Sequence, residues 1–266
     1  YDSRTYVSCR EADNLINTVM QAKALPTVLF PYAFLTPFCS LLVPEVAEKR
    51  SAGDSVGIKS ITETACRFVF AFGICAAGIV ISYSCEIGEI IYSDVEAGKY
   101  IRLLAPIMPV MFIDTTIDSI LKGLNEQLYG MKVNLIDSIL SVGVVFLLVP
   151  NIGMLGYVIE IIFCEIVNTT LSAARLIKLT SPRIRPVKLI IIPLATVSLS
   201  IFITKALLGL LGVGCAYNAL LLTLHIALVI FVYSFLLRNA ECRICSFVIP
   251  SKQIHKAGKP VGMVAM

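Results

Sequence analysis

The sequence contains no tryptophan, only two histidines and few charged side chains among its 266 residues. Asp, Glu, Lys and Arg together make up 15% of the chain, whereas they make up about 25% of an ordinary soluble domain. Two histidines leave little material for histidine-based catalysis or metal binding. The scarcity of charge argues against a soluble protein, because a soluble surface needs more charged side chains than these.

Motifs for nucleotide, metal or serine chemistry are also missing. We find no P-loop, no H-E-x-x-H and no G-x-S-x-G pattern. Cys242 and Cys245 have metal-ligand spacing, but a zinc site needs about four ligands, and the sequence offers no second pair beside them. Four further cysteines lie inside apolar runs, where a free thiol behaves as a small hydrophobe: Cys39, Cys66, Cys75 and Cys164. We therefore expect no enzymatic activity, no metal, no cofactor and no nucleic-acid partner.

Long apolar runs dominate what is present. Hydrophobic residues make up 57% of the chain, and its mean hydropathy is +0.85. A transmembrane helix needs about 20 apolar residues. The sequence therefore predicts an all-α membrane protein, a polytopic bundle of about seven transmembrane helices. The predicted spans are 25–43, 65–84, 101–121, 133–150, 155–176, 189–211 and 219–237.

Proline interrupts two of these runs. Membrane helices tolerate proline because neighbouring groups satisfy the freed backbone carbonyls. We expect the first and third spans to be kinked or locally unwound, as is common in transporters whose halves rock. The prolines concerned are Pro26, Pro31, Pro37, Pro106 and Pro109.

Basic residues predict the orientation of the spans. Most of the 22 Lys and Arg residues fall in the C-terminal segment and in the loops after the first, third and fifth spans. The positive-inside rule places these segments in the cytoplasm. We interpret residues 1–22 as an outer loop or interfacial helix, 23–240 as a transmembrane lobe and 241–266 as a basic cytoplasmic tail. A chain that enters the membrane from outside usually follows earlier spans, so we expect this one to be the second half of a longer protein.

Six ionisable side chains fall inside the predicted spans. Such groups are costly in a membrane, so each is a candidate functional residue. They are Asp114, Asp118, Asp137, Glu160, Glu165 and Lys205.

The third and fourth spans carry three of these acids near their cytoplasmic ends. Asp118 precedes Lys122 by four residues, the favourable order for an ordinary helical ion pair. Asp137 lies in the first turns of its span, where the helix dipole favours an anion. Asp114 lies one turn deeper than Asp118 and has no local partner. Asp118 and Asp137 are expected at similar height on adjacent helices.

The fifth and sixth spans carry the other three ionisable side chains. Glu160 and Lys205 lie at matching depth near the outer surface, so they either form an interhelical pair or Lys205 extends to the surface alone. Glu165, Asn168 and Thr169 form a polar stripe with helical spacing. This stripe either packs against another helix through hydrogen bonds or lines a water-filled path.

Two stretches resemble a known transporter family. "ALPTVLFPYAFLTPFCSLLVPEVAEKRSAGD" (24–54) resembles the opening of the second half of polysaccharide flippases, and "SILKGLNEQLYGMKVNLIDSILSVGVVFLLVPNIGMLGYVI" (119–159) resembles the next hallmark. The matching positions are Val43, Pro44, Glu45, Glu48, Gly53, Gly123, Pro150, Gly153 and Gly156. The chain is thus similar to stage V sporulation protein B-like members of the multidrug/oligosaccharidyl-lipid/polysaccharide exporter superfamily.

The resemblance implies a fold and a function. Family members have 12–14 spans in two lobes that alternate access around a central cavity, and this chain would be the C-terminal lobe. They flip lipid-linked oligosaccharides or cell-wall precursors across the cytoplasmic membrane, and the spore-associated branch is linked to envelope construction. The implied partners are membrane lipids, a lipid-linked sugar and the missing N-terminal lobe.

The internal charges keep other functions open. Basic residues that meet a pyrophosphate are expected in such flippases, but this chain has five internal acids and a single internal Lys. A cation-coupled exporter of small organic molecules, coupled to H⁺ or Na⁺, is therefore an alternative, and a non-transporting membrane scaffold is a third. The residues assigned to the substrate or ion path are Asp114, Asp118, Asp137, Glu165 and Asn168.

Overall fold

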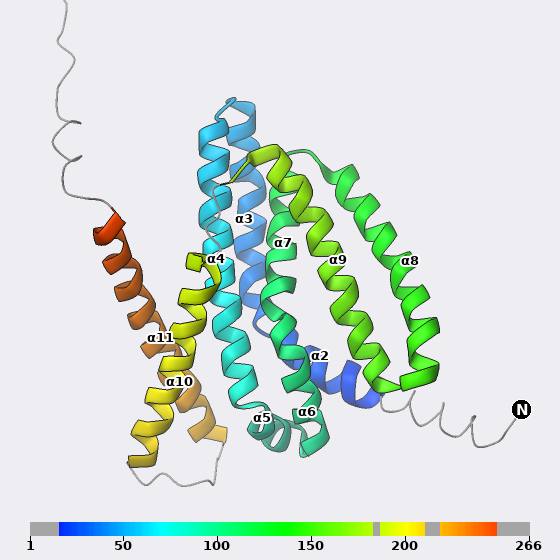
Figure 1. Ribbon diagram of the computed structural model, residues 1–266, viewed down its shortest axis with the longest axis vertical. Coiled ribbons are helices and arrows are strands. Elements are labelled where there is room, and N and C mark those ends of the chain that lie inside the picture. Colours follow the sequence, from blue (N-terminus) through cyan, green and yellow to red (C-terminus); the bar gives the residue numbers. More distant parts are fainter. Residues whose placement is uncertain (1–15, 183–186, 211–218, 249–266) are drawn as a thin grey trace, which may run out of the picture.

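The computed structural model describes residues 16–182, 187–210 and 219–248. Within these residues every regular element is a helix, and the helices run roughly side by side (Figure 1). Predictions for residues 1–15 and for the segment beyond Val248 lie outside the described residues.

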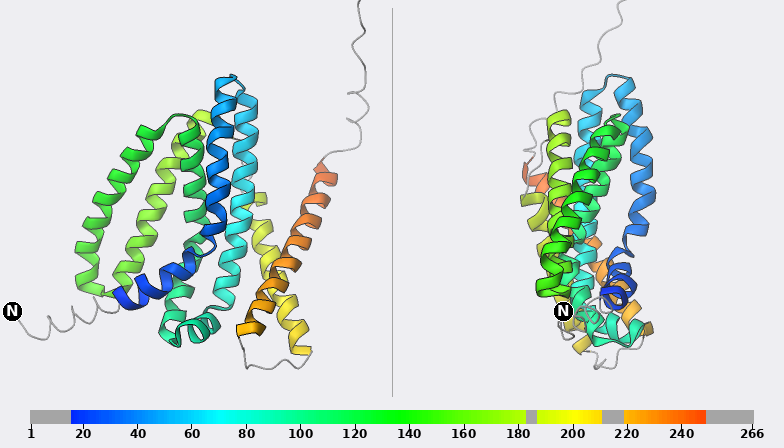
Figure 2. Two further views of the ribbon diagram at one scale, coloured as in Figure 1. Left: turned by 180° about the vertical axis from the view of Figure 1, so that it is seen from behind. Right: turned by 90° about the vertical axis from the view of Figure 1, so that its right-hand side faces the viewer.

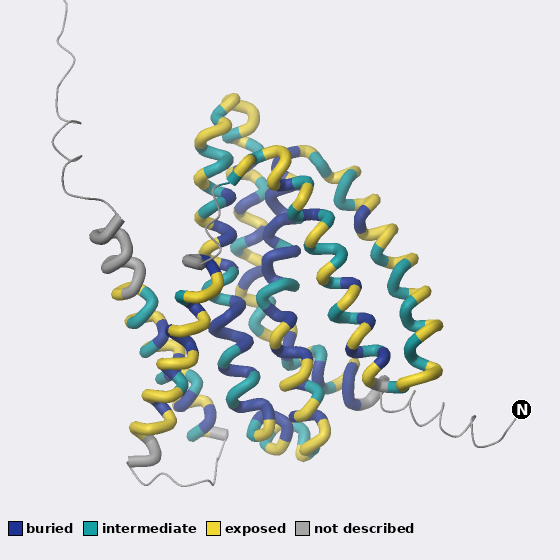
Figure 3. The backbone as a smooth tube through the Cα atoms, in the orientation of Figure 1, coloured by how far each residue is buried: buried dark blue, intermediate teal, exposed yellow. Residues whose placement is uncertain are grey.

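The centre of the bundle is formed by α3 (Tyr32–Ser51), α4 (Ser55–Ser82) and α7 (Met108–Gly123), which pack on one another. A large share of the buried residues lies on these helices, as Figure 3 shows. Glycines permit close approach of the backbones. A Cβ on Gly73 would lie 2.9 Å from Cα of Pro109, and one on Gly123 would lie 2.8 Å from the carbonyl oxygen of Val43. Small residues at such crossings are typical of membrane helices.

Two helical hairpins flank this centre. On one side, α9 (Met154–Thr180) packs on α7, and α8 (Gln127–Ile152) lies outside α9. On the other side, α10 (Ile192–Leu210) and α11 (Ala219–Val248) pack on each other and on α4. The two views in Figure 2 show this nearly planar arrangement. The outer face of α8 exposes large apolar side chains such as Phe146, as expected of a surface that faces lipid.

In the described part of the chain, six helices are long and apolar enough to cross a membrane, and a seventh span results if one bent helix pair is counted as a single crossing. The six are Ser55–Ser82, Val95–Gly123, Gln127–Ile152, Leu155–Thr180, Leu189–Leu207 and Leu220–Asn239. The prediction of an all-α polytopic membrane protein is confirmed.

The bent pair contains the proline-rich first span. Helix η1 (Ile16–Ala24) continues into α2 (Leu25–Leu29), and the chain then turns by 56° into α3. Pro31 lies at this break. Pro26 lies in the first turn of α2, where its missing N–H costs little, and α3 continues through Pro37 without interruption.

The third span is interrupted in a milder way. It consists of α6 (Val95–Leu104), a 3₁₀ turn η2 (Ala105–Ile107) and α7. Pro106 lies in the 3₁₀ turn and Pro109 lies in the first turn of α7. This placement fits the backbone preference of proline for helix starts.

An acidic cap holds the start of the third span. Asp94 precedes α6, follows the short helix α5 (Ser84–Tyr92) and accepts hydrogen bonds from the backbone N–H groups of Glu96 and Ala97. It also forms a 2.6 Å ion pair with Lys23, which fastens the bent N-terminal segment to this end of the bundle. Lys23 and the two backbone donors lower the pKa of Asp94.

Candidate functional site

A group of carboxylates lies where α7 faces the α8–α9 hairpin. Asp114 and Asp118 occupy successive turns of α7, Asp137 comes from α8 and Glu165 from α9. The four groups are close enough to act electrostatically on one another. The structure thus brings together all five residues predicted to line a substrate or ion path, because Asn168, also on α9, lies beside these four carboxylates. We call these five residues the acidic cluster.

Asp114 is the most enclosed carboxylate of the acidic cluster. Its side chain is 8% exposed, and its Oδ2 atom accepts a 3.1 Å hydrogen bond from the amide of Asn168. Its other oxygen, Oδ1, is buried and has no hydrogen bond of standard geometry among the described residues, although the Thr169 hydroxyl lies near enough to act on the carboxylate. Unsatisfied buried polar atoms are rare in proteins and commonly mark a place for water, an ion or a proton. Asp114 therefore has unused acceptor capacity in the interior of the lobe.

Helix α9 contributes a longer polar stripe than the sequence pattern indicated. Glu165, Asn168, Thr169 and Ser172 follow one another at helical spacing, so they share one face. Within the described part of the chain, the hydroxyl of Ser172 is buried without a hydrogen-bond partner, and the hydroxyl of Thr169 lies near Asp114. The sequence analysis missed Ser172, although its spacing of seven from Glu165 continues the same stripe.

The predicted ion pair between Asp118 and Lys122 does not form at contact distance. No contact of 4.0 Å or less joins the two side chains, and Lys122 acts on Asp118 only at longer range. The correct helical spacing makes such a pair possible but does not overcome the entropy of holding two side chains together. Among the described residues, therefore, no cation forms a close ion pair with the carboxylate of Asp118.

Of the two alternatives for Glu160 and Lys205, the interhelical pair does not form, because each side chain has a different partner. Glu160 is buried and accepts a 2.5 Å hydrogen bond from Ser141 on α8. Lys205 lies on the opposite side of α7, where its ammonium donates to the carbonyl of Ser82 and lies 5.3 Å from the centre of the Tyr83 ring. Matching depth did not make the two helices neighbours, because α10 packs on α4 and not on α9.

The chemistry of the acidic cluster is that of cation or proton uptake. Carboxylates held together away from bulk water repel one another, so binding positive charge relieves the repulsion. Among the described residues, no group of three or more His, Cys, Asp or Glu has the geometry to hold a metal ion. The arrangement therefore fits protons better than a tightly coordinated metal.

A second feature is a large apolar cavity of about 1,050 Å³ between the bent N-terminal segment, α4 and α11. Aromatic rings supply much of its wall, among them Phe30, Phe34 and Phe72. Arg238, in the C-terminal half of α11, lies on the same wall. This cavity could not be predicted from the sequence, because its walls come from helices that are far apart in the chain. We call it the apolar groove.

Comparison with known proteins finds a distant sequence similarity. The chain is 23% identical to Stage V sporulation protein B of Bacillus subtilis (strain 168) over 214 residues. The match covers 80% of this chain and 40% of that protein, so the chain spans less than half the length of this curated relative. No protein-family profile and no solved structure matches the chain.

Proposed function

We propose that this chain is the C-terminal lobe of a membrane transporter that flips a lipid-linked oligosaccharide or cell-wall precursor across the cytoplasmic membrane by alternating access. The likeness to Stage V sporulation protein B and the polytopic helical fold support this proposal. The missing N-terminal lobe would complete the central cavity. The basic loops and the tail would lie in the cytoplasm, as the positive-inside rule predicts.

The apolar groove is the observation that carries the proposal. Ligand cavities usually measure about 300–1,000 Å³, so a volume of about 1,050 Å³ is at the large end of that range. Its apolar and aromatic wall suits alkyl chains, and Arg238 on the wall suits a phosphate at the end of such a chain. A lipid with an anionic head has both of these chemical parts.

The acidic cluster supports a coupled mechanism. A carboxylate group that changes its charge when it takes up protons would hold α7, α8 and α9 together differently in its two states. We assign Asp114, Asp118, Asp137, Glu165 and Asn168 to this coupling step. A cation-coupled exporter of small organic molecules is the second candidate, and the scarcity of basic residues near the acidic cluster favours it.

A pair of substitutions on α11 tests the lipid path. Ser234 lines the apolar groove, whereas its neighbour Phe235 is exposed and does not. In the full-length protein reconstituted in vesicles, Ser234→Trp should slow translocation of a fluorescent lipid-linked oligosaccharide at least about ten-fold, because the indole ring obstructs part of the groove. Phe235→Trp should translocate at the parent rate.

The same assay separates the candidates. If Ser234→Trp flips the lipid as fast as the parent, the groove is not the lipid path. If the parent protein moves small organic cations in response to a proton gradient but leaves the lipid in place, the exporter replaces the flippase as the proposed function.

A further inference from the structure

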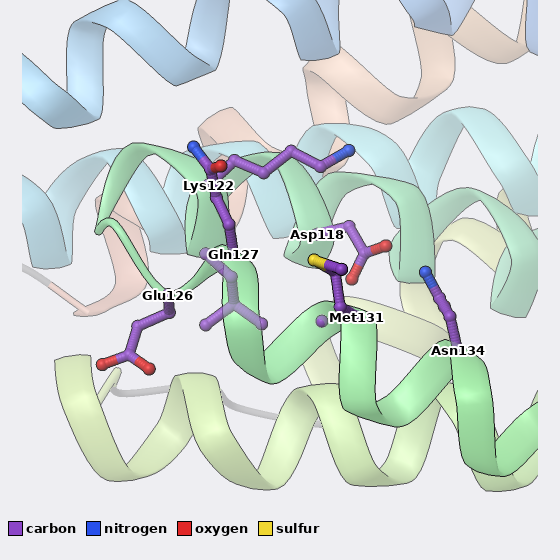
Figure 4. Close-up of a pocket in the computed structure, with 8 residues that line it drawn as sticks. Asp118, Lys122, Glu126, Gln127, Met131 and Asn134 are labelled. Atoms are coloured by element: carbon purple, nitrogen blue, oxygen red, sulfur yellow. The ribbon is translucent and has the colours of Figure 1, made fainter.

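A smaller cavity lies between the end of α7 and the start of α8. It has a volume of about 290 Å³, and the close-up in Figure 4 shows the side chains around it. We call it the α7–α8 cavity. The residues used below are Asp118 and Lys122 from α7 and Gln127, Gly130, Met131 and Asn134 from α8.

The wall of the α7–α8 cavity can hold water. The carboxylate of Asp118 points toward α8, between Met131 and Asn134 (Figure 4). The amides of Gln127 and Asn134 add donors and acceptors to the same wall. A water molecule occupies about 30 Å³ in the liquid and needs two to four polar partners, so the cavity has room and partners for several.

The rim of the cavity is structurally fixed. Glu126 forms a 2.8 Å ion pair with Arg175 on α9, and the Tyr129 hydroxyl donates to the carbonyl of Leu171. The guanidinium of Arg175 lies 5.3 Å from the centre of the Tyr129 ring. These contacts hold the first turn of α8 against the last turns of α9. The rim of the α7–α8 cavity is therefore held in place by contacts between α8 and α9.

Behind the cavity lies the buried part of the acidic cluster. Asp114 is one helical turn beyond Asp118 on the same face of α7, a rise of about 6 Å. Its Oδ1 atom and the hydroxyl of Ser172 have no hydrogen-bond partners in the described part of the chain, and both side chains are more than nine-tenths buried. The carboxylates of Asp118 and Asp114, one helical turn apart, thus connect the α7–α8 cavity to unsatisfied polar atoms in the interior.

The other charged groups near this line are few. Asp137 faces it from α8, Glu165 from α9 and Lys122 from α7. Lys122 lies on the wall of the cavity, at the end of the bundle where the loop basic residues gather. The positive-inside rule assigns this end to the cytoplasm.

We infer that the α7–α8 cavity is the aqueous entrance through which protons reach Asp114 from the basic end of the lobe. Hydronium in the cavity gives a proton to the carboxylate of Asp118 and leaves water. The proton then passes to the carboxylate of Asp114, and Asp118 is ionised again. The role of this path in coupling rests on the proposed transport function, but the path itself does not depend on the transported substrate.

Glycines on α8 allow a matched test. A Cβ on Gly130 or on Gly143 would meet no atom within 4 Å, so both positions accept a side chain without a clash at Cβ. Gly130 lines the α7–α8 cavity, whereas Gly143 lies farther along the same helix and does not. Gly130→Phe should plug the cavity, and Gly143→Phe is its control. Met131→Trp is a second plug from the same wall.

The experiment uses the full-length protein in sealed vesicles with N,N′-dicyclohexylcarbodiimide, which reacts with protonated carboxyls. Modification of Asp114 is followed by mass spectrometry after the buffer on one side is acidified. In the parent and in Gly143→Phe, acid on the basic side should speed modification, and acid on the opposite side should not. In Gly130→Phe or Met131→Trp, the response to basic-side acid should slow at least about ten-fold.

Three results would overturn the inference. They are an unchanged response in both plugged variants, a response to acid on the opposite side only, and no modification of Asp114 at any pH. The readout is independent of lipid movement. A protein that shows the expected proton access but flips no lipid would contradict only the proposed function.

Discussion

The side-chain amide of Asn168 on α9 donates a 3.1 Å hydrogen bond to Asp114 on α7, and this bond joins the central helices to the α8–α9 hairpin. It also orients a carboxylate that has a second, unsatisfied oxygen. The bond therefore has both a packing role and a chemical role, because the same carboxylate ends the inferred proton path.

Removing this bond should destabilise the lobe. Asn168→Leu leaves Asp114 without its donor, and an unsatisfied buried polar group costs about 1–3 kcal/mol. We expect a lower midpoint of thermal unfolding in detergent. Thr170→Ala is the control, because Thr170 is exposed and its hydroxyl bonds only within its own helix. Equal midpoints for both variants would show that the Asn168–Asp114 bond adds nothing to stability.

The bond between Ser141 and Glu160 allows a second comparison. Ser141→Ala removes the 2.5 Å donor of a buried acid, which should cost about 1–3 kcal/mol in unfolding free energy. Ser138→Ala, one turn earlier on α8, removes an exposed hydroxyl that bonds to its own helix and should be nearly neutral. Denaturant unfolding of the two variants measures the difference, and a neutral Ser141→Ala would contradict the assignment.

Close packing of α3 and α7 depends on Gly123. A Cβ at this position would lie 2.8 Å from the carbonyl oxygen of Val43, so Gly123→Ala should strain the crossing by about 1–3 kcal/mol. Gly143→Ala places its methyl group in open space and should stabilise α8 by up to about 1 kcal/mol. Opposite shifts of the unfolding midpoint are expected, and a stabilised Gly123→Ala would show that the helices can move apart without cost.

The ion pair of Lys23 and Asp94 predicts a pH dependence. Asp94 has a lowered pKa in the folded protein, because Lys23 and two backbone N–H groups stabilise its charged form. Its contribution is complete above the ordinary value of 3.8 and is lost as the pH falls through the lower folded value. Asp94→Asn keeps an acceptor for the helix cap but loses the charge.

The unfolding midpoint of Asp94→Asn should therefore fall less than that of the parent between neutral pH and pH 3. Glu96→Gln removes a neighbouring acid that takes no part in this ion pair and is the control. If the parent and Asp94→Asn lose stability in parallel, Lys23 and Asp94 are not coupled in solution.

Several features could be predicted from local sequence. The helical class followed from apolar runs long enough to cross a membrane, and a kink in the first span from the backbone constraints of proline, although not its position at Pro31. The four carboxylates of the acidic cluster could be singled out because an ionisable group inside an apolar run is conspicuous, and Asn168 because its helical spacing places it on the face of Glu165. These features depend only on residues near one another in the chain.

The sequence by itself determined that this chain is helical and apolar and how far along each predicted span its acidic residues lie. The tertiary structure decided which helices are neighbours and how each is rotated. It gave Asp114 the partner Asn168, gave Glu160 the partner Ser141, and moved Lys205 away to α4. Depth fixes only the height of a group in the bundle, whereas a hydrogen bond needs contact within about 3 Å. Contact depends on how side chains far apart in the sequence pack together.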